Sequence, residues 1–483
     1  MARGPRPATE LRTVTSLPNR PPRLRAEAAR LLTLAVPLVL STGCFSITLF
    51  VDRALLMWDD PAVAGAALSA GNVYWTCVCL PVMAIGFLPT IVSQCAGRGR
   101  GDAVGPAVWQ GVWLTALAAP LFVLLGVFAP AVFSLAGHEA SLAASETAYF
   151  RWLMLVAPGS MLEAALSAFF VGRGVGRPVL AVNVLASVVN VALDWVLIFG
   201  WGPIPALHEV GAAQATAAAM WLKVAAYVWL IRRSGGSFGF GDRGVRRPLM
   251  TSLFSRGMAV GVQQVFKTAT VSGVLLAIGT AGGAPLAATT VVLSLVQLAT
   301  IPLVGLSTAL TSRVGQLCEG GGRAVKPAIY AGIGLFGVCV AGDLLAAWAS
   351  GGTLTRLFLP EAEATAEVAE WVATLAPWGV LLLVADTVGL FSAGVVRGVG
   401  ETRVLLTSTL AASGIVGVLS VCGYGAGPEG AWRLLAVWSF SQALLSTLWL
   451  ARRTAAAGDR DLSSLPIPEP AAGSEPAAIP QAA

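Results

Sequence analysis

Twelve long apolar runs divide this chain and constrain its fold more than any other feature. Each run is long enough to cross a bilayer core of about 30 Å, and short stretches that carry most of the charges separate the runs. Because hydrocarbon offers no partner to backbone N–H and C=O groups, each run is expected to be an α-helix. The runs cover residues 30–55, 63–95, 106–134, 147–172, 178–201, 210–231, 250–280, 286–318, 326–349, 365–396, 402–424 and 430–451. The sequence therefore predicts an all-α integral membrane protein with twelve transmembrane helices.

The composition of the chain excludes several classes of function. Hydrophobic residues make up 56% of the chain and charged residues only 12%, about half the charged fraction of a soluble protein. The net charge of +6 comes from basic residues between the apolar runs, as expected of membrane topology signals, so no nucleic-acid partner is expected. The seven cysteines form neither a disulfide framework nor a set of four zinc ligands. We therefore expect no resident metal and no cofactor.

The chain carries the same pattern twice. Arg173-Gly-Val-Gly176 recurs as Arg397-Gly-Val-Gly400, and Gln94, at the end of the second run, has a counterpart in Gln316, about 222 positions later. Internal duplication in an apolar chain is typical of secondary transporters, whose substrate site lies between two lobes. Six helices in each half make the halves parallel repeats, related by a pseudo-two-fold axis along the membrane normal.

The duplication and the charged stretches predict how the chain is divided. Basic residues alternate with acidic ones from loop to loop, and the positive-inside rule then places both termini in the cytoplasm. We expect a monomer in the cell inner (plasma) membrane, in contact with the lipid bilayer. The predicted parts are a disordered tail at 1–29, lobes at 30–231 and 250–453, a cytoplasmic linker at 232–249 and a disordered tail at 454–483.

Several motifs, in order and spacing along residues 30–453, resemble those of the multidrug and toxic compound extrusion (MATE) transporters. This resemblance implies cation-coupled efflux of small organic compounds, driven by protons or sodium. It is carried by Val51-Asp52, Pro89-Thr-Ile-Val-Ser-Gln94, Gly172-Arg-Gly-Val-Gly176, Asn190-Val-Ala-Leu-Asp194, Gly211-Ala-Ala-Gln-Ala-Thr216 and Asp386 with Gly394, Arg397, Gly398 and Gly400.

Four polar positions in the first lobe form a candidate cation site. In the family that the chain resembles, Asp52, Asn190, Asp194 and Thr216 line such a site. Helix lengths place Asp194 and Thr216 at the same height, about 24 Å from the basic loops, and Asn190 one turn below Asp194 on the same face. Carboxylate, amide and hydroxyl oxygens suit sodium, and a carboxylate pair can share a proton. The alternative is that Asn190 and Thr216 only join helices, and that Asp52 pairs with Arg53.

The second lobe departs from the family pattern. Many members have a glutamate where this chain has Lys267. Lys267 and Asp386 both lie about 16 Å from the basic loops, and opposite charges buried at equal depth are expected to pair. Such a pair would leave cation coupling to the first lobe. It could also be purely structural, or Lys267 could face the cavity and favour anionic or carbonyl-rich cargo.

The cavity between the lobes needs aromatic and polar side chains to hold flat organic cargo. Its candidate residues are Phe45, Tyr74, Glu163, Gln263, Gln264 and Phe391.

The predicted function is a proton- or sodium-coupled antiporter that works by alternating access. A flippase for lipid-linked precursors or polysaccharide is the alternative of similar architecture, although it would need several central arginines to hold pyrophosphate. An ion channel is a further alternative, and no catalytic set lies within the runs, so an enzyme is not expected.

Overall fold

The computed structural model describes residues 24–135, 140–234, 238–279, 282–349, 365–457, 461–462 and 465. Within these ranges, each predicted apolar run corresponds to a long helical segment. The first half contains α1 (Leu24–Asp59), α2 (Pro61–Ile85), α3 (Leu88–Gly97), α4 (Val104–Leu135), α5 (Ala140–Gly172), α6 (Arg177–Phe199) and α7 (His208–Arg233). The second half contains α8 (Arg247–Gly279), α9 (Gly283–Leu317), α10 (Gly321–Ala349), α12 (Thr365–Val399), α13 (Thr402–Val421) and α14 (Gly427–Ala457).

These helices have the length and composition of membrane spans. Ten stretches of the described residues are long and apolar enough to cross a membrane, and one of the ten, Gly283–Ala349, contains both α9 and α10. α8 is not among them, because Arg256, Lys267 and two glutamines lower its hydropathy, but its 33 residues extend about 50 Å. The chain is thus a nearly all-helical, multi-pass membrane protein.

The second apolar run is not one continuous helix. α2 ends at Ile85 and α3 begins at Leu88, with Pro89 in its first turn. Proline has no backbone N–H to donate, so it breaks the ladder of a continuous helix but is tolerated in a first turn. The backbone turns here through a bond from the Phe87 N–H to the Ala84 carbonyl, at 3.3 Å. The single helix predicted for residues 63–95 is therefore two.

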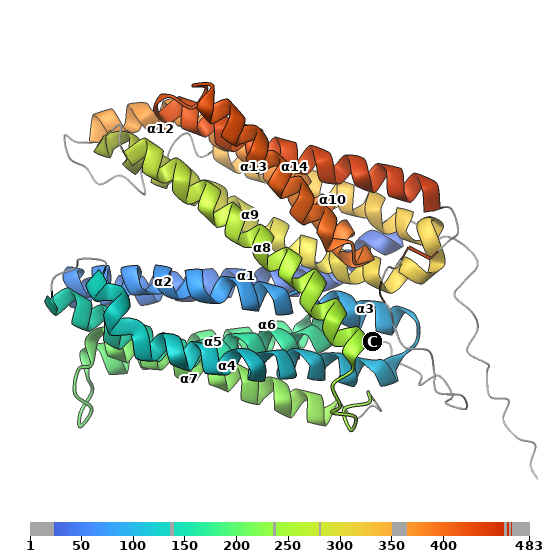
Figure 1. Cartoon of the computed structure of the whole chain (residues 1–483), viewed down its shortest axis with the longest axis horizontal. Coiled ribbons are helices and arrows are strands. Elements are labelled where there is room, and N and C mark those ends of the chain that lie inside the picture. The colour runs from blue at the N-terminus through green and yellow to red at the C-terminus, as the bar shows by residue number, and fades with distance from the viewer. Residues whose placement is uncertain are drawn as a thin grey trace, which may run out of the picture.

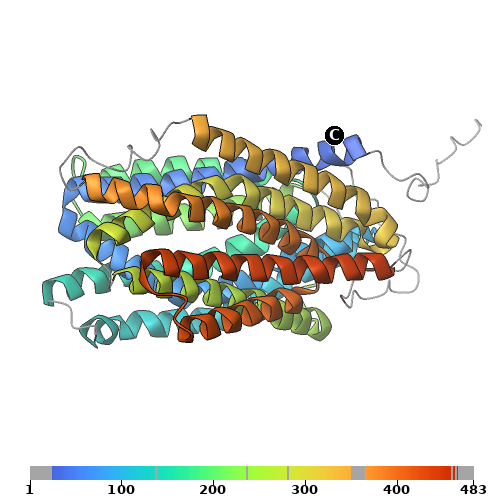
Figure 2. The ribbon, with the colours of Figure 1, turned by 90° about the horizontal axis from the view of Figure 1, so that it is seen from above.

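The helices form two bundles that run along the long axis of the molecule (Figure 1), and Figure 2 shows them roughly parallel when seen from above. The first bundle is α1–α7 and the second is α8–α14. Packing repeats between them, since α2 packs on α5 as α9 packs on α12, and α5 packs on α7 as α12 packs on α14. Contacts between the bundles are made mainly by α2 with α8 and by α1 and α3 with α9. The duplicated sequence thus folds into a duplicated packing pattern.

The segments predicted as tails take part in the fold near their inner ends. α1 begins at Leu24, so the part of the predicted tail from Leu24 to residue 29 is helical, and residues 1–23 lie outside the described residues. At the other terminus, α14 extends to Ala457. Beyond it, the Leu462 N–H donates to the carbonyl of Cys318 at 3.1 Å, and Asp461 forms an ion pair with Arg98 at 2.8 Å.

The linker between the bundles packs against α4. Phe238 is 4% exposed and accepts a backbone hydrogen bond from Gly105 at 2.7 Å. Trp109 donates from its indole N–H to the carbonyl of Phe240 at 3.1 Å, and Trp113 donates to Arg243 at 2.8 Å. These bonds hold the basic linker along the same end of the bundle as the other basic loops. We call this the basic end, and it carries Arg98, Arg173, Arg313 and Arg397.

Candidate functional site

A buried polar cluster lies in the first bundle, toward the end opposite the basic end. Asp194 and Asn190 of α6 are 0% and 3% exposed. With its amide oriented to suit both neighbours, Asn190 donates to Asp194 Oδ2 at 3.3 Å and accepts from the backbone N–H of Thr216 on α7, also at 3.3 Å. Thr216 therefore joins the cluster through its backbone. In the described structure its hydroxyl makes no hydrogen bond to the carboxylates.

Asp52 of α1 completes this cluster. Its side chain is 7% exposed and lies close enough to Asp194 for the two carboxylates to interact electrostatically. One oxygen of each, Asp52 Oδ1 and Asp194 Oδ1, is buried without a hydrogen-bond partner in the described structure. The exposed Arg53 also interacts electrostatically with Asp52, although no ion pair between the two is present among the described residues. Two enclosed carboxylates with unsatisfied oxygens form a site that a proton or a hard cation would complete.

Tyr149 of α5 belongs to the same cluster and was not predicted. It is 6% exposed and interacts electrostatically with both Asp52 and Asp194. Its phenol can donate a hydrogen bond to a carboxylate or accept one from a protonated acid. A single tyrosine in an apolar run carries little signal. Only the packing of α5 against its neighbours brings Tyr149 to the acids.

In the second bundle, Lys267 of α8 and Asp386 of α12 face each other. Lys267 Nζ lies 3.8 Å from Asp386 Oδ2, and Ser439 of α14 donates to Asp386 Oδ1 at 3.1 Å. The lysine side chain is 43% exposed and that of the aspartate 18%. Asp386 is therefore held by two partners, whereas the amine remains accessible. An accessible ammonium group in this bundle can attract negative or carbonyl oxygen atoms.

The predicted cavity residues occupy different surroundings. Phe45 is 56% exposed, and the Tyr74 hydroxyl lies 3.5 Å from Ser160 Oγ, inside the first bundle. Glu163 of α5 interacts electrostatically with Lys223 of α7, also within that bundle. Tyr74 and Glu163 therefore contact polar partners within the first bundle, whereas Phe45 is exposed.

The candidates of the second bundle are mostly enclosed. Gln263 is 8% exposed, and Gln264 donates to Thr268 one turn along the same helix, at 3.4 Å. Phe391 is 9% exposed and packs edge-on against Phe336, with ring centroids 5.7 Å apart. Phe391 thus packs between α10 and α12 in this conformation.

At the basic end, the two bundles are joined by reciprocal contacts of the duplicated motifs. Gln94 of α3 donates to the carbonyls of Gly398 and Val399, at 2.8 and 3.1 Å. Its counterpart Gln316 of α9 donates to the carbonyl of Gly172 at 3.0 Å. Each glutamine therefore binds the glycine-rich turn of the other half. The repeated residues are the ones that connect the repeats.

An ion pair lies beside these glutamines. Arg313 of α9 donates from Nε and Nη2 to the two oxygens of Glu27 on α1, at 2.9 and 2.8 Å. The Glu27 side chain is 0% exposed and that of Arg313 is 18% exposed. We call the contacts of Glu27, Arg313, Gln94 and Gln316 the basic-end junction. Its ion pair was not predicted, because Glu27 was assigned to a disordered tail.

The bundles separate away from this junction. The inter-bundle hydrogen bonds described above all lie at the basic end, whereas His208 contacts Asp59 at the opposite end, at 2.8 Å, within the first bundle. Figure 1 shows the helices of the two bundles diverging from the end that holds α3. This arrangement is closed at the basic end.

Comparisons with known proteins agree with this duplicated, two-bundle architecture. The model of the MatE family matches the chain twice, at residues 37–196 and 261–421. The structure is similar to a eukaryotic MATE transporter, with 20% identity, a TM-score of 0.77, and coverage of 89% of this chain and 96% of that one. It is also similar to a MOP superfamily transporter from Pyrococcus furiosus described as having a binding pocket of reverse polarity (18% identity, TM-score 0.76, 89% and 96% covered).

A third similar structure is the outward-facing conformation of a multidrug resistance MATE family transporter, with 18% identity, a TM-score of 0.78, and coverage of 89% and 96%. At these identities the likeness establishes the fold. The two family matches, which together cover more than half of the chain, establish the family. The chain therefore belongs to the MatE family of membrane transporters, the multidrug and toxic compound extrusion type, rather than to a family of enzymes.

Proposed function

We propose that this protein is a cation-coupled antiporter that exports organic compounds by alternating access, with protons or sodium as the coupling ion. The observation that carries the proposal is the buried cluster of Asp52, Asp194, Asn190 and Tyr149 in the first bundle. Two carboxylates enclosed together repel each other strongly, and a bound cation relieves that repulsion. The cluster therefore gains free energy from taking up a positive ion.

The face that is open places this conformation within the proposed transport cycle. With the basic end cytoplasmic, the closed junction makes this conformation open to the outside. An external cation enters the acid cluster, cargo leaves, and the bundles then rock to open the basic end. The cation drives export only if it binds more tightly to one arrangement than to the other. We propose a monomer in the cell inner membrane with both termini in the cytoplasm.

The second bundle needs no coupling ion of its own in this scheme. The ammonium group of Lys267 lies beside Asp386, where it supplies a fixed positive charge. A carboxylate that is already paired gains little from an added cation. Coupling is therefore assigned to the acids of the first bundle.

The experiment is efflux of a fluorescent organic dye from proteoliposomes under imposed pH or sodium gradients. Asp52→Asn and Asp194→Asn should each abolish the response to both gradients, because either change removes the carboxylate repulsion that a cation relieves. Asp343→Asn is the matched control, since it neutralises an aspartate on α10, outside the cluster. Gradient-driven efflux by the Asp52→Asn, Asp194→Asn double variant at the parent rate would contradict the proposal.

A further inference from the structure

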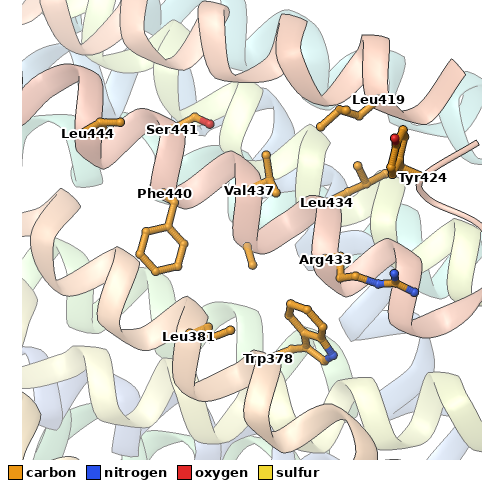
Figure 3. Close-up of a pocket in the computed structure, with 11 residues that line it drawn as sticks. Trp378, Leu381, Leu419, Tyr424, Arg433, Leu434, Val437, Phe440, Ser441 and Leu444 are labelled. Carbon is orange, nitrogen blue, oxygen red and sulfur yellow. The ribbon is translucent and has the colours of Figure 1, made fainter. Parts of the chain in front are cut away.

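An apolar groove with a polar mouth lies on the second bundle, away from the acid cluster and from the junction. Its volume is about 570 Å³, and α12, α13, α14 and the turn after α13 line it. Figure 3 shows Trp378, Tyr424 and Arg433 at one end, and Leu381, Phe440 and Leu444 toward the other. The lining is thus divided into a polar mouth and an apolar channel.

The groove opens on the outer surface of the bundle. Trp432 and Leu435, on the opposite face of α14, are 0% and 1% exposed and pack in the bundle core. Phe440 and Leu444, on the groove side, are 41% and 58% exposed. The extensive contacts with the first bundle are made by α8, α9 and α10 rather than by α13 or α14. In a membrane, this groove therefore faces lipid.

The height of the groove matches one leaflet. Trp378, Tyr424 and Arg433 each lie about 20 residues along the chain from the basic end of their helix, or about 30 Å at 1.5 Å per residue. That distance equals the thickness of a bilayer core. Leu444 lies about three turns deeper along α14, or about 16 Å below Arg433, which is half of that thickness. The mouth lies at headgroup level, and the channel reaches the midplane.

The mouth offers hydrogen-bond donors and a positive charge. The Arg433 guanidinium, the Trp378 indole N–H and the Tyr424 hydroxyl make no hydrogen bond or ion pair within the described structure. Glu429, one turn before Arg433 on α14, is exposed and forms no ion pair with it there. Arginine recognises phosphate oxygens through paired N–H donors, and tryptophan and tyrosine favour the headgroup level.

We propose that this groove binds an anionic phospholipid from the leaflet at the end opposite the basic end, the outer leaflet in the orientation proposed above. One acyl chain lies along Leu381, Phe440 and Leu444, and the headgroup phosphate accepts hydrogen bonds from Arg433, Trp378 and Tyr424. An interfacial belt of aromatic anchors would need no apolar channel beneath it and would show no preference among headgroups. The channel, together with a cation that has no partner among the described residues, distinguishes a lipid site from such a belt.

The test is native mass spectrometry of the purified full chain with an equimolar mixture of phosphatidylglycerol and phosphatidylcholine that have the same acyl chains. The parent protein should retain phosphatidylglycerol preferentially. Arg433→Gln should lower that retention by about tenfold, the lower range for losing a charged hydrogen bond. Retention of phosphatidylcholine should fall less, because its choline offsets the negative charge of the phosphate that Arg433 binds. Arg433→Lys should retain part of the preference, since it keeps the charge. Arg247→Gln, which removes an exposed arginine at the basic end, is the matched control and should have no effect.

A second variant tests the channel rather than the mouth. Val437→Phe fills the groove between Arg433 and Phe440 and should reduce retention of both lipids. Thermal unfolding midpoints confirm that each variant is folded. Equal retention of the two lipids by the parent protein overturns the proposal, as does a preference that survives Arg433→Gln. Displacement of the lipid by inorganic phosphate at equal concentration also overturns it, because the acyl chain would then contribute nothing.

Discussion

Replacing Arg313 by alanine should release the basic-end junction. Arg313 binds both oxygens of Glu27, at 2.8 and 2.9 Å, and the carboxylate is 0% exposed in the closed arrangement. Removing one partner of a buried ion pair costs about 3–5 kcal/mol, and we take the lower figure because the exposed Arg30 still contacts Glu27. Opening the basic end would return Glu27 to water. Because about 1.4 kcal/mol corresponds to a factor of ten, the equilibrium should shift more than a hundredfold, to about 150-fold or beyond, toward the open arrangement.

Cys318 provides a reporter for this opening. It is 1% exposed, with Sγ 3.7 Å from the carbonyl of Gly398 in the closed junction. In a background where the other six cysteines are replaced, the labelling rate of Cys318 by a membrane-impermeant maleimide measures how often the basic end opens. Arg313→Ala should raise that rate by at least tenfold, even if part of the free-energy change is lost to relaxation.

Arg30→Ala is the matched control. Arg30 also binds Glu27, at 2.9 Å, but its side chain is 60% exposed. An exposed ion pair contributes at most about 1 kcal/mol, so labelling should change by only a few fold. An unchanged rate in Arg313→Ala would refute the role of the ion pair. Equal acceleration by both variants would show that net charge at Glu27, rather than the buried geometry, controls the junction.

Two further predictions concern the duplicated motifs and the second bundle. Gln94→Leu and Gln316→Leu should each accelerate labelling of Cys318, because each leaves carbonyls of the opposite half without a donor. If only one of the two variants changes the labelling rate, the two glutamines do not have equivalent roles in the junction. Lys267→Met should leave Asp386 with Ser439 alone, so efflux of anionic dyes should fall relative to cationic ones, and an unchanged ratio would exclude Lys267 from cargo selection.

The helices of this fold were predictable because they coincide with apolar runs of the sequence. In hydrocarbon, length and hydropathy leave the backbone no other regular structure. The packing repeat was predictable in outline from the twin Arg-Gly-Val-Gly motifs. The break between α2 and α3 was not predicted, because hydropathy stays high through it. The signal was local, in Gly86 and Pro89, which both disfavour a continuous helix.

The acid cluster was predictable where it depends on spacing along one helix. Asn190 and Asp194 are four residues apart, so any α-helix places them on one face. Tyr149 was not predictable, because the hydropathy of α5 does not reveal which of its faces turns toward the acids of α1 and α6. The position of Phe391 could not be predicted for the same reason, since an aromatic residue in an apolar helix suits a packed core as well as a cavity. Glu27 and Arg313 lie 286 residues apart, and no local pattern connects them.

α1 connects the basic-end junction and the acid cluster, the two sites that the proposed mechanism needs. It carries Glu27 at the basic-end junction and Asp52 in the acid cluster, about 38 Å apart along one helix. It also packs on α6, which carries Asp194, and on α9, which carries Arg313. A continuous helix that belongs to both sites can change their states together, which is the physical requirement for coupling.

The labelling assay can test this connection. In the proposed cycle the cation-loaded protein is the one that opens the basic end, so acidic pH or added sodium should speed labelling of Cys318 in the otherwise cysteine-free parent. A coupling free energy of about 1–3 kcal/mol corresponds to about a 5- to 150-fold change. Asp52→Asn imitates a neutralised site, so its labelling should be fast and independent of both ions. If Asp52→Asn keeps the ion dependence of the parent, the junction responds to some other group, and α1 does not connect the two sites.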